Sequence, residues 1–151
     1  MEQNIDWGSL GFGYVPTDYN VRCTYTNGAW GELRVESKPT LEMHISAAVL
    51  HYAQECFEGL KAFRGKDGKV RIFRIEDNGR RMQDSCRGIK MPEFPLDKFK
   101  EAVIKVVKLN EKFIPPYETG ASLYIRPVLF GTTPLVGVKP ASDYEFVVFV
   151  T

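Results

Sequence analysis

The chain has 151 residues, with 20 lysines and arginines against 19 aspartates and glutamates, 44% hydrophobic residues and 26% charged residues. This length suits about one domain, and the composition is ordinary for a globular protein. A formal net charge of +1 lacks the basic excess that predicts binding to nucleic acid or to an anionic membrane. No apolar run approaches the ~20 residues of a membrane-spanning helix.

The cysteines predict neither a metal site nor a disulfide framework. Cys23, Cys56 and Cys86 form no CxxC motif and have no histidine at metal-ligand spacing. Three free thiols favour a reducing cytoplasm. The first residues also lack the basic and apolar regions of a signal peptide. We therefore expect a cytoplasmic protein without a bound metal.

The first elements expected along the chain are a hairpin and a short helical turn. Residues 21–25 and 32–36 have strand-like composition, and the Asn-Gly pair at 27–28 between them is a strong hairpin signal. A lysine and a proline then break the second strand. Residues 46–52 are expected to form a short helical turn capped by Ser46.

Further strands are expected on both sides of a helical region. Residues 58–63 and 69–73 flank a turn rich in glycine at 65–68, which predicts a second hairpin. Near the end, residues 122–131 and 144–150 also read as strands. The last of these is nearly all apolar, which is typical of a central strand.

Two consecutive helices are expected between these strands. The first covers 75–89, with Asp77 or Asn78 as its cap. The second is an amphipathic helix whose apolar stripe runs over 99–113 and is stopped by the Pro-Pro pair at 115–116. Lysines occupy much of its other face, which is typical of a solvated surface.

This order of elements predicts an α+β fold across 1–151, a two-layer sandwich of a largely antiparallel sheet with two main helices on one face. Strands and helices do not alternate, and the chain contains neither a G-x-G-x-x-G motif nor a Walker A motif. The chain stops directly after an apolar strand, so we expect it to be part of a longer protein.

Two sets of polar residues are candidates for binding an anion. A guanidinium such as Arg81, within the first helix, can grip a phosphate with two hydrogen bonds, although an exposed helical arginine needs no such role. Tyr124 and Arg126 lie two apart on a strand and so share a face, where they could orient a carboxylate or merely decorate the surface. No serine has a histidine at triad spacing, and nothing favours a glycosidase built on Glu55 and Glu58.

Several ordered segments together resemble the small N-terminal domain of branched-chain aminotransferases, pyridoxal-phosphate enzymes of fold type IV. The resemblance runs from Phe12 to the last residue and rests on the following motifs: Phe12-Gly13, Leu50-His51-Tyr52, the run from Phe57 to Phe63, Arg81-Met82, the run from Ser122 to Pro127, and Gly137-Val138-Lys139. The chain departs from the family at Gly79-Arg80, where relatives commonly carry a longer apolar side chain.

The resemblance implies a role for several aromatic and basic residues. Arg81 matches the arginine that holds the phosphate of pyridoxal 5'-phosphate. The aromatic walls of the pocket for the branched side chain correspond to Phe12, Tyr52 and Phe57. The pair near the substrate carboxylate corresponds to Tyr124 and Arg126.

The resemblance also implies a homodimer, because Val136 and Val138 match a loop that reaches into the neighbouring subunit's site. It implies transamination of leucine, isoleucine and valine with 2-oxoglutarate. The lysine that forms the Schiff base lies in the family's larger C-terminal domain, so none is assigned in this chain, and we expect the chain to be inactive alone. The alternatives are a D-amino-acid aminotransferase, an aminodeoxychorismate lyase, and a stand-alone, non-catalytic α+β module that binds a ligand or a partner protein.

Overall fold

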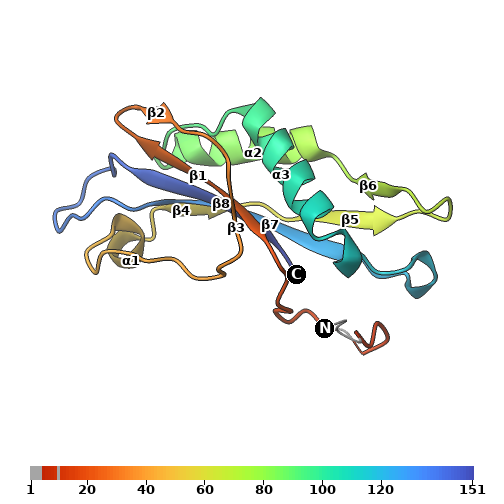
Figure 1. Ribbon diagram of the computed structural model, residues 1–151. Helices are drawn as coiled ribbons and strands as arrows, with labels where there is room; N and C mark the ends of the chain where they lie inside the picture. The colour runs from red at the N-terminus through yellow and green to blue at the C-terminus, as the bar shows by residue number, and fades with distance from the viewer. Residues whose placement is uncertain (1–4, 10) are drawn as a thin grey trace.

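A computed structural model describes residues 5–9 and 11–151. It contains one curved sheet with two long helices on one face (Figure 1). In chain order the elements are β1 (Asn20–Thr26), β2 (Ala29–Trp30), β3 (Arg34–Glu36), α1 (Ala48–Tyr52), β4 (Glu55–Phe57), β5 (Leu60–Arg64), β6 (Val70–Ile72), α2 (Ile75–Gly88), α3 (Leu96–Leu109), the 3-10 turns η1 (Glu111–Phe113) and η2 (Tyr117–Thr119), β7 (Leu123–Gly131) and β8 (Tyr144–Val150).

The sheet confirms the predicted α+β class. Its strands follow the order β2-β1-β8-β7-β5-β6, with β3 paired to β1 and β4 paired to β7. Every pairing between these strands is antiparallel. The apolar strand β8 lies between β1 and β7, which confirms its predicted central position.

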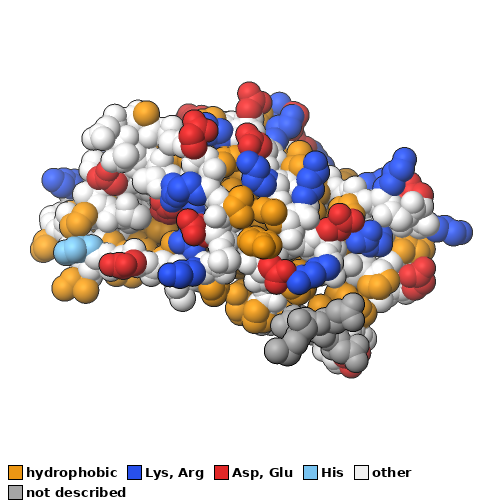
Figure 2. All heavy atoms as spheres, viewed as in Figure 1, with side chains coloured by type: hydrophobic (Ala, Val, Ile, Leu, Met, Phe, Trp, Pro, Cys, Tyr) orange, Lys and Arg blue, Asp and Glu red, His pale blue; other side chains and the backbone are white. Residues whose placement is uncertain are grey.

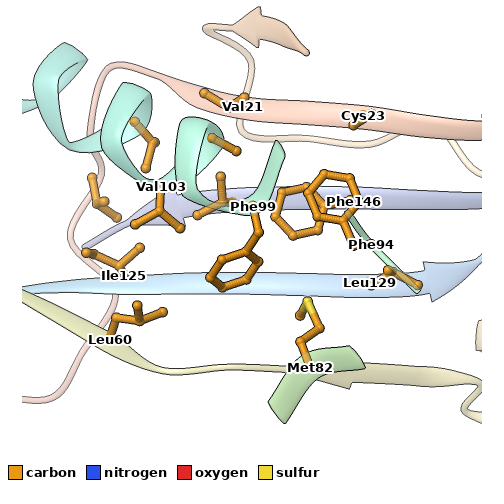
Figure 3. Close-up of a cluster of buried hydrophobic side chains, with 14 of the residues drawn as sticks. Val21, Cys23, Leu60, Met82, Phe94, Phe99, Val103, Ile125, Leu129 and Phe146 are labelled. Atoms are coloured by element: carbon orange, nitrogen blue, oxygen red, sulfur yellow. The ribbon is translucent and has the colours of Figure 1, made fainter. Parts of the chain in front are cut away.

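The core lies between the sheet and the helices α2 and α3. Phe94, in the loop between the helices, stacks on Phe146 of β8 with ring centroids 3.9 Å apart, and Phe99 of α3 meets the same ring edge-on (Figure 3). Along β7 the side chains alternate, so Ile125 and Leu129 are fully buried in this core. Tyr124, Arg126 and Val128 alternate with them and point to the opposite face of the sheet.

The first hairpin is confirmed at its predicted turn. Asn27 and Gly28 both have positive φ, 53° and 80°, as a type I′ turn requires. The strand expected at 32–36 is shorter, however, because the chain pairs first through β2 and again through β3. Gly31, between these two strands, donates its N–H to the carbonyl of Thr24 at 2.9 Å.

The predicted helix caps are wrong. Ala47 precedes α1 without a side-chain bond, and the hydroxyl of Ser46 lies 2.8 Å from Nδ1 of His44. The helix α2 begins after Arg74, whose left-handed φ of 52° turns the chain into the helix before Asp77 and Asn78 are reached. Those two residues lie inside the first turn, where Asn78 donates to the carbonyl of Arg74 at 2.9 Å.

The helix α3 ends at Leu109, short of the predicted 113. It stops because Asn110 turns its amide toward the N-terminal segment, accepting the N–H groups of Asp18 and Tyr19 at 3.0 and 3.1 Å. The chain continues as the 3-10 turn η1.

The outer surface of the helices carries mixed charge. On the face drawn in Figure 2, basic and acidic side chains are interspersed over α2 and α3, and several of them form ion pairs such as Lys100–Glu76 at 2.7 Å. None of the described helices is long and apolar enough to cross a membrane.

Candidate functional site

The part of the candidate site around Tyr124 and Arg126 lies on the sheet face opposite α2 and α3, where two short strands meet β7. β4 pairs with one end of β7 and β5 with the other, so the edge beside β7 is interrupted at Glu58 and Gly59. The N–H of Glu58 still donates to the carbonyl of Pro127 at 2.9 Å. This bond, together with the strand pairing on either side of it, fixes Phe57, Glu58 and Gly59 beside β7, which carries Tyr124 and Arg126.

Tyr124 and Arg126 share this face, as predicted. The hydroxyl oxygen of Tyr124 accepts from Nε and Nη2 of Arg126 at 3.1 and 2.9 Å. The guanidinium carbon also lies 4.2 Å from the ring centroid of Phe57, in a cation–π arrangement. Because two nitrogens are engaged and the plane is backed by an aromatic ring, the guanidinium is held in one orientation. Nη1 forms no hydrogen bond within the described part of the chain.

Gly59 allows the phenol of Tyr124 to reach this position. A Cβ at Gly59 would lie 2.6 Å from the hydroxyl oxygen of Tyr124, closer than real Cβ contacts. The φ of Gly59 is not in the left-handed region, so its backbone conformation does not call for a glycine. The close approach of the Tyr124 side chain does.

An aromatic hollow of about 340 Å³ opens next to this pair and is lined by Phe12, Tyr124 and Arg126. Phe12 is 85% exposed and meets Tyr124 edge-on, with ring centroids 5.2 Å apart. Tyr14 and Phe149 also line the hollow and were missed from the sequence. The alternation along the strand 144–150 was an available signal for Phe149, because it points away from the buried side chains that flank it.

The segment that carries Phe12 is tied to the end of β8. The N–H of Val15 donates to Oγ1 of Thr151 at 2.7 Å, and the hydroxyl of Thr17 donates to the carbonyl of Val150 at 2.9 Å. These bonds link residues far apart in sequence, so they fix the aromatic wall to the strand that lies beside Arg126.

Arg81 is paired with a buried carboxylate. Its Nε lies 2.8 and 3.1 Å from the two carboxylate oxygens of Glu58, and its Nη2 lies 2.6 Å from Oε2. The side chain of Glu58 is 3% exposed, whereas that of Arg81 is 67% exposed. The hydrogen bonds to Glu58 raise the pKa of Arg81 above its ordinary value. The sequence did not reveal this pair, whose members are 23 residues apart.

A smaller hollow of about 240 Å³ lies between Asn78 of α2 and Tyr124 of β7. Its lining includes Gly59, Asn78 and Tyr124, with Phe63 and Phe73 as apolar walls. The side-chain oxygen of Asn78 also lies 3.4 Å from Nη2 of Arg81. Lys61 also lines the hollow, and Arg81 does not line it but lies beside it through Asn78. The hollow thus combines apolar walls with nearby cations, which suits an aromatic ligand that bears an anionic group.

Tyr52 lies elsewhere, at the far end of β7. Its hydroxyl donates to the carbonyl of Val136, so the structure places it with the 132–138 loop rather than with Phe12 and Phe57. The loop is held by the bond from the N–H of Leu135 to the carbonyl of Ser46 at 2.9 Å. Val136 and Val138 are 84% and 85% exposed at its tip. The eight residues named from the sequence thus form three groups: the Phe12, Phe57, Tyr124 and Arg126 cluster, Arg81 with its partner, and the Tyr52, Val136 and Val138 loop.

The chain has relatives among known sequences and among solved structures. No family model matches it. It is 45% identical over 147 residues to the branched-chain-amino-acid aminotransferase of Helicobacter pylori, which aligns with 97% of this chain. The chain spans only 43% of the length of that relative and of the similar enzyme from Haemophilus influenzae.

Solved structures of the same enzyme class share this fold. The branched-chain amino acid aminotransferase of Escherichia coli superposes with a TM-score of 0.68 at 24% identity, over 90% of this chain and 41% of that one. That of Thermobaculum terrenum, in its PLP form, has a TM-score of 0.62 at 22% identity, over 89% and 39% of the two chains. This chain is therefore similar in sequence to branched-chain aminotransferases over nearly its whole length, shares the fold of their solved structures, and spans about 43% of the length of the two bacterial relatives.

Proposed function

We propose that this chain forms the small N-terminal domain of a branched-chain amino acid transaminase, which moves amino groups between leucine, isoleucine or valine and 2-oxoglutarate. The observation that carries the proposal is the Tyr124–Arg126 pair, backed by Phe57 and opening onto the aromatic hollow. A fixed cation beside an apolar wall suits a molecule that has a carboxylate at one end and a branched hydrocarbon at the other.

The substrate carboxylate would be bound by Arg126 and Tyr124. The phenol oxygen already accepts two N–H groups from Arg126, which leaves its own proton free to donate to an anion. The guanidinium contributes Nη1, and the resulting charge-assisted bonds are stronger than neutral ones. Phe12 and Phe149 would cover the apolar part of the substrate and exclude water from it.

The cofactor would be pyridoxal 5'-phosphate, with Arg81 as the ligand of its phosphate. The exposed guanidinium and the hollow that reaches from Asn78 to Tyr124 support this assignment. When bound, this cofactor supplies the electron sink that stabilises a carbanion at the substrate carbon. The lysine that carries the cofactor and the acidic partner of its ring nitrogen would come from a larger C-terminal domain outside these 151 residues, so we propose that this chain alone is inactive.

A second copy of the longer protein would complete the pocket. Val136 and Val138 project from the loop tip with most of their surface exposed, as expected of side chains that enter a neighbouring subunit. We therefore propose a homodimer, located in the cytoplasm as the free thiols suggest.

The test is a transaminase assay on the product of the complete reading frame that contains this chain. Conversion of leucine, isoleucine and valine with 2-oxoglutarate is expected. Activity only with D-alanine would instead assign a D-amino-acid aminotransferase. In parallel, this chain should be mixed with the cofactor, reduced with borohydride and mapped by peptides. No stoichiometric adduct on a lysine is expected, and a specific adduct within these residues would overturn the assignment of the lysine to another domain.

A further inference from the structure

We infer that Glu58 is a positioning residue that holds the guanidinium of Arg81 in the orientation needed to receive the cofactor phosphate. The inference rests on the proposed function and deepens it, since it concerns the same phosphate site. Its basis is the geometry of the pair.

The two side chains are joined through one edge of the guanidinium. Nε and Nη2 of Arg81 both bind the carboxylate of Glu58, at distances between 2.6 and 3.1 Å. Nη1 forms no hydrogen bond to any residue that the structure describes. An arginine side chain normally samples many rotamers, and a two-point attachment removes most of that freedom before a ligand arrives.

The carboxylate of Glu58 is the buried member of the pair. Glu58 is 3% exposed and Arg81 is 67% exposed, so the guanidinium lies between the carboxylate and solvent. An anion arriving from solvent would meet the cation before the buried negative charge. The Glu58 backbone is itself fixed by its bond to the carbonyl of Pro127 at 2.9 Å.

Glu58 also connects the candidate phosphate site at Arg81 with the candidate carboxylate site at Tyr124 and Arg126. Its neighbour Phe57 lies against the guanidinium of Arg126, and its neighbour Gly59 lies against the hydroxyl of Tyr124. The residue that orients the phosphate arginine is therefore built into the same three-residue segment that backs the candidate carboxylate site.

Two effects of Glu58 on a bound phosphate have opposite signs. Orientation of Arg81 strengthens binding, whereas the negative charge of the carboxylate weakens it. Because the carboxylate is held behind the guanidinium, we expect orientation to dominate. The substitution Glu58→Gln distinguishes the two effects, since it removes the charge and the two-oxygen grip while keeping the size of the side chain.

The experiment uses the complete apoprotein and measures its affinity for pyridoxal 5'-phosphate and, separately, for pyridoxal, which has the same ring but no phosphate. Glu58→Gln is expected to weaken the phosphate form by about tenfold. The affinity for pyridoxal should not change. Glu55→Gln is the matched control, because Glu55 is an exposed glutamate at the start of β4 that does not contact Arg81, and it should leave both affinities unchanged.

A double-mutant cycle shows whether the effect acts through Arg81. In an Arg81→Ala background, Glu58→Gln should have no further effect on affinity for the phosphate form. An equal loss for both ligands, an unchanged affinity or tighter binding of the phosphate form would each overturn the positioning role. If Glu58→Gln does not fold, Glu58→Asp, which keeps the charge but has a shorter reach, is measured in the same way with the same expected direction.

Failure of the proposed function gives a different result. If the unmodified protein bound neither ligand, or if Arg81→Ala weakened the two ligands equally, Arg81 would not be the phosphate ligand. The assignment of the phosphate site would then fall together with this inference. If Arg81→Ala selectively weakens the phosphate form but Glu58→Gln does not, only the positioning role is overturned.

Discussion

Gly59 and Tyr124 are in such close contact that a Cβ on the glycine would lie 2.6 Å from the phenol oxygen and 3.3 Å from two ring atoms. The Tyr124 ring belongs to a central strand and its hydroxyl is already bound to Arg126, so it has little room to move aside. The position of the candidate carboxylate site therefore depends on the absence of a side chain on the neighbouring strand edge.

The first prediction concerns this contact. In the proposed transaminase that contains this chain, Gly59→Ala should displace the phenol and lower kcat/KM for leucine by roughly tenfold or more, since small misplacements at a reacting centre are costly. Steady-state kinetics with leucine and 2-oxoglutarate measure the effect. Gly88→Ala is the matched control, because a Cβ there would meet nothing within 4 Å. A Gly59→Ala variant with unchanged kinetics would show that Tyr124 does not take part in substrate binding.

The second prediction concerns the guanidinium of Arg126. Arg126→Lys keeps the positive charge, but an ammonium cannot present two parallel N–H groups to the phenol or stack flat on Phe57. We expect KM for leucine to rise by about tenfold or more, with a smaller change in kcat. Phe57→Leu should raise KM less, by a few-fold, since an exposed cation–π contact contributes about 0.5–1 kcal/mol. Equal effects of the two substitutions would contradict this ranking.

The parts of this fold that were predictable from the sequence depend on local rules. The Asn27-Gly28 turn has positive φ at both residues, which few residue pairs tolerate, and the nearly all apolar strand 144–150 is paired along both edges, with β1 and β7. The shared face of Tyr124 and Arg126 follows from the period of a strand alone. Each of these features is fixed within a few residues.

The features that the sequence did not reveal depend on contacts between distant segments. Glu58 and Arg81 are on separate elements, and nothing local marks a buried carboxylate there. The end of α3 is set by Asn110, which binds the backbone of residues near 18 and 19. The predicted cap of α2 was wrong for a different reason, because Arg74 before the helix adopts a left-handed conformation that local propensity does not favour.

The third prediction concerns Asn110, a fully buried amide whose oxygen and nitrogen each make two hydrogen bonds. Asn110→Ala should lower the free energy of unfolding by about 2 kcal/mol or more, because it leaves the N–H groups of Asp18 and Tyr19 without their acceptor. Urea denaturation measures the loss. Lys108→Ala, at an exposed position two residues earlier, should change it by less than about 0.5 kcal/mol.

The same substitution should also loosen the segment that carries Phe12. Limited proteolysis before Asn20 is expected to become faster in Asn110→Ala, because the segment loses one of its attachments to the core. An unchanged cleavage rate would mean that the bonds from Val15 and Thr17 to the end of the chain are sufficient to hold it.

The fourth prediction concerns acid stability. Hydrogen bonds from the hydroxyls of Ser142, Thr26 and Thr133 hold the pKa of Asp143 below its ordinary value. Because the unfolded chain takes up this proton at a higher pH than the folded chain does, the stabilisation is complete above the ordinary carboxyl pKa of about 3.9 and is lost as the pH falls below it toward the folded value. Unfolding midpoints in urea, measured between neutral pH and about pH 3, should therefore decrease as the pH falls below about 3.9.

Replacement of this carboxylate tests its share of that dependence. Asp143→Asn keeps the size of the side chain but cannot titrate, so the variant should be less stable than the unmodified chain at neutral pH and closer to it at the acid end. Asp6→Asn changes the same group near the N-terminus, away from these hydroxyls, and should keep the full pH dependence. If Asp143→Asn ran parallel to the unmodified chain over the whole range, the three hydroxyls would not contribute to acid stability through this carboxylate.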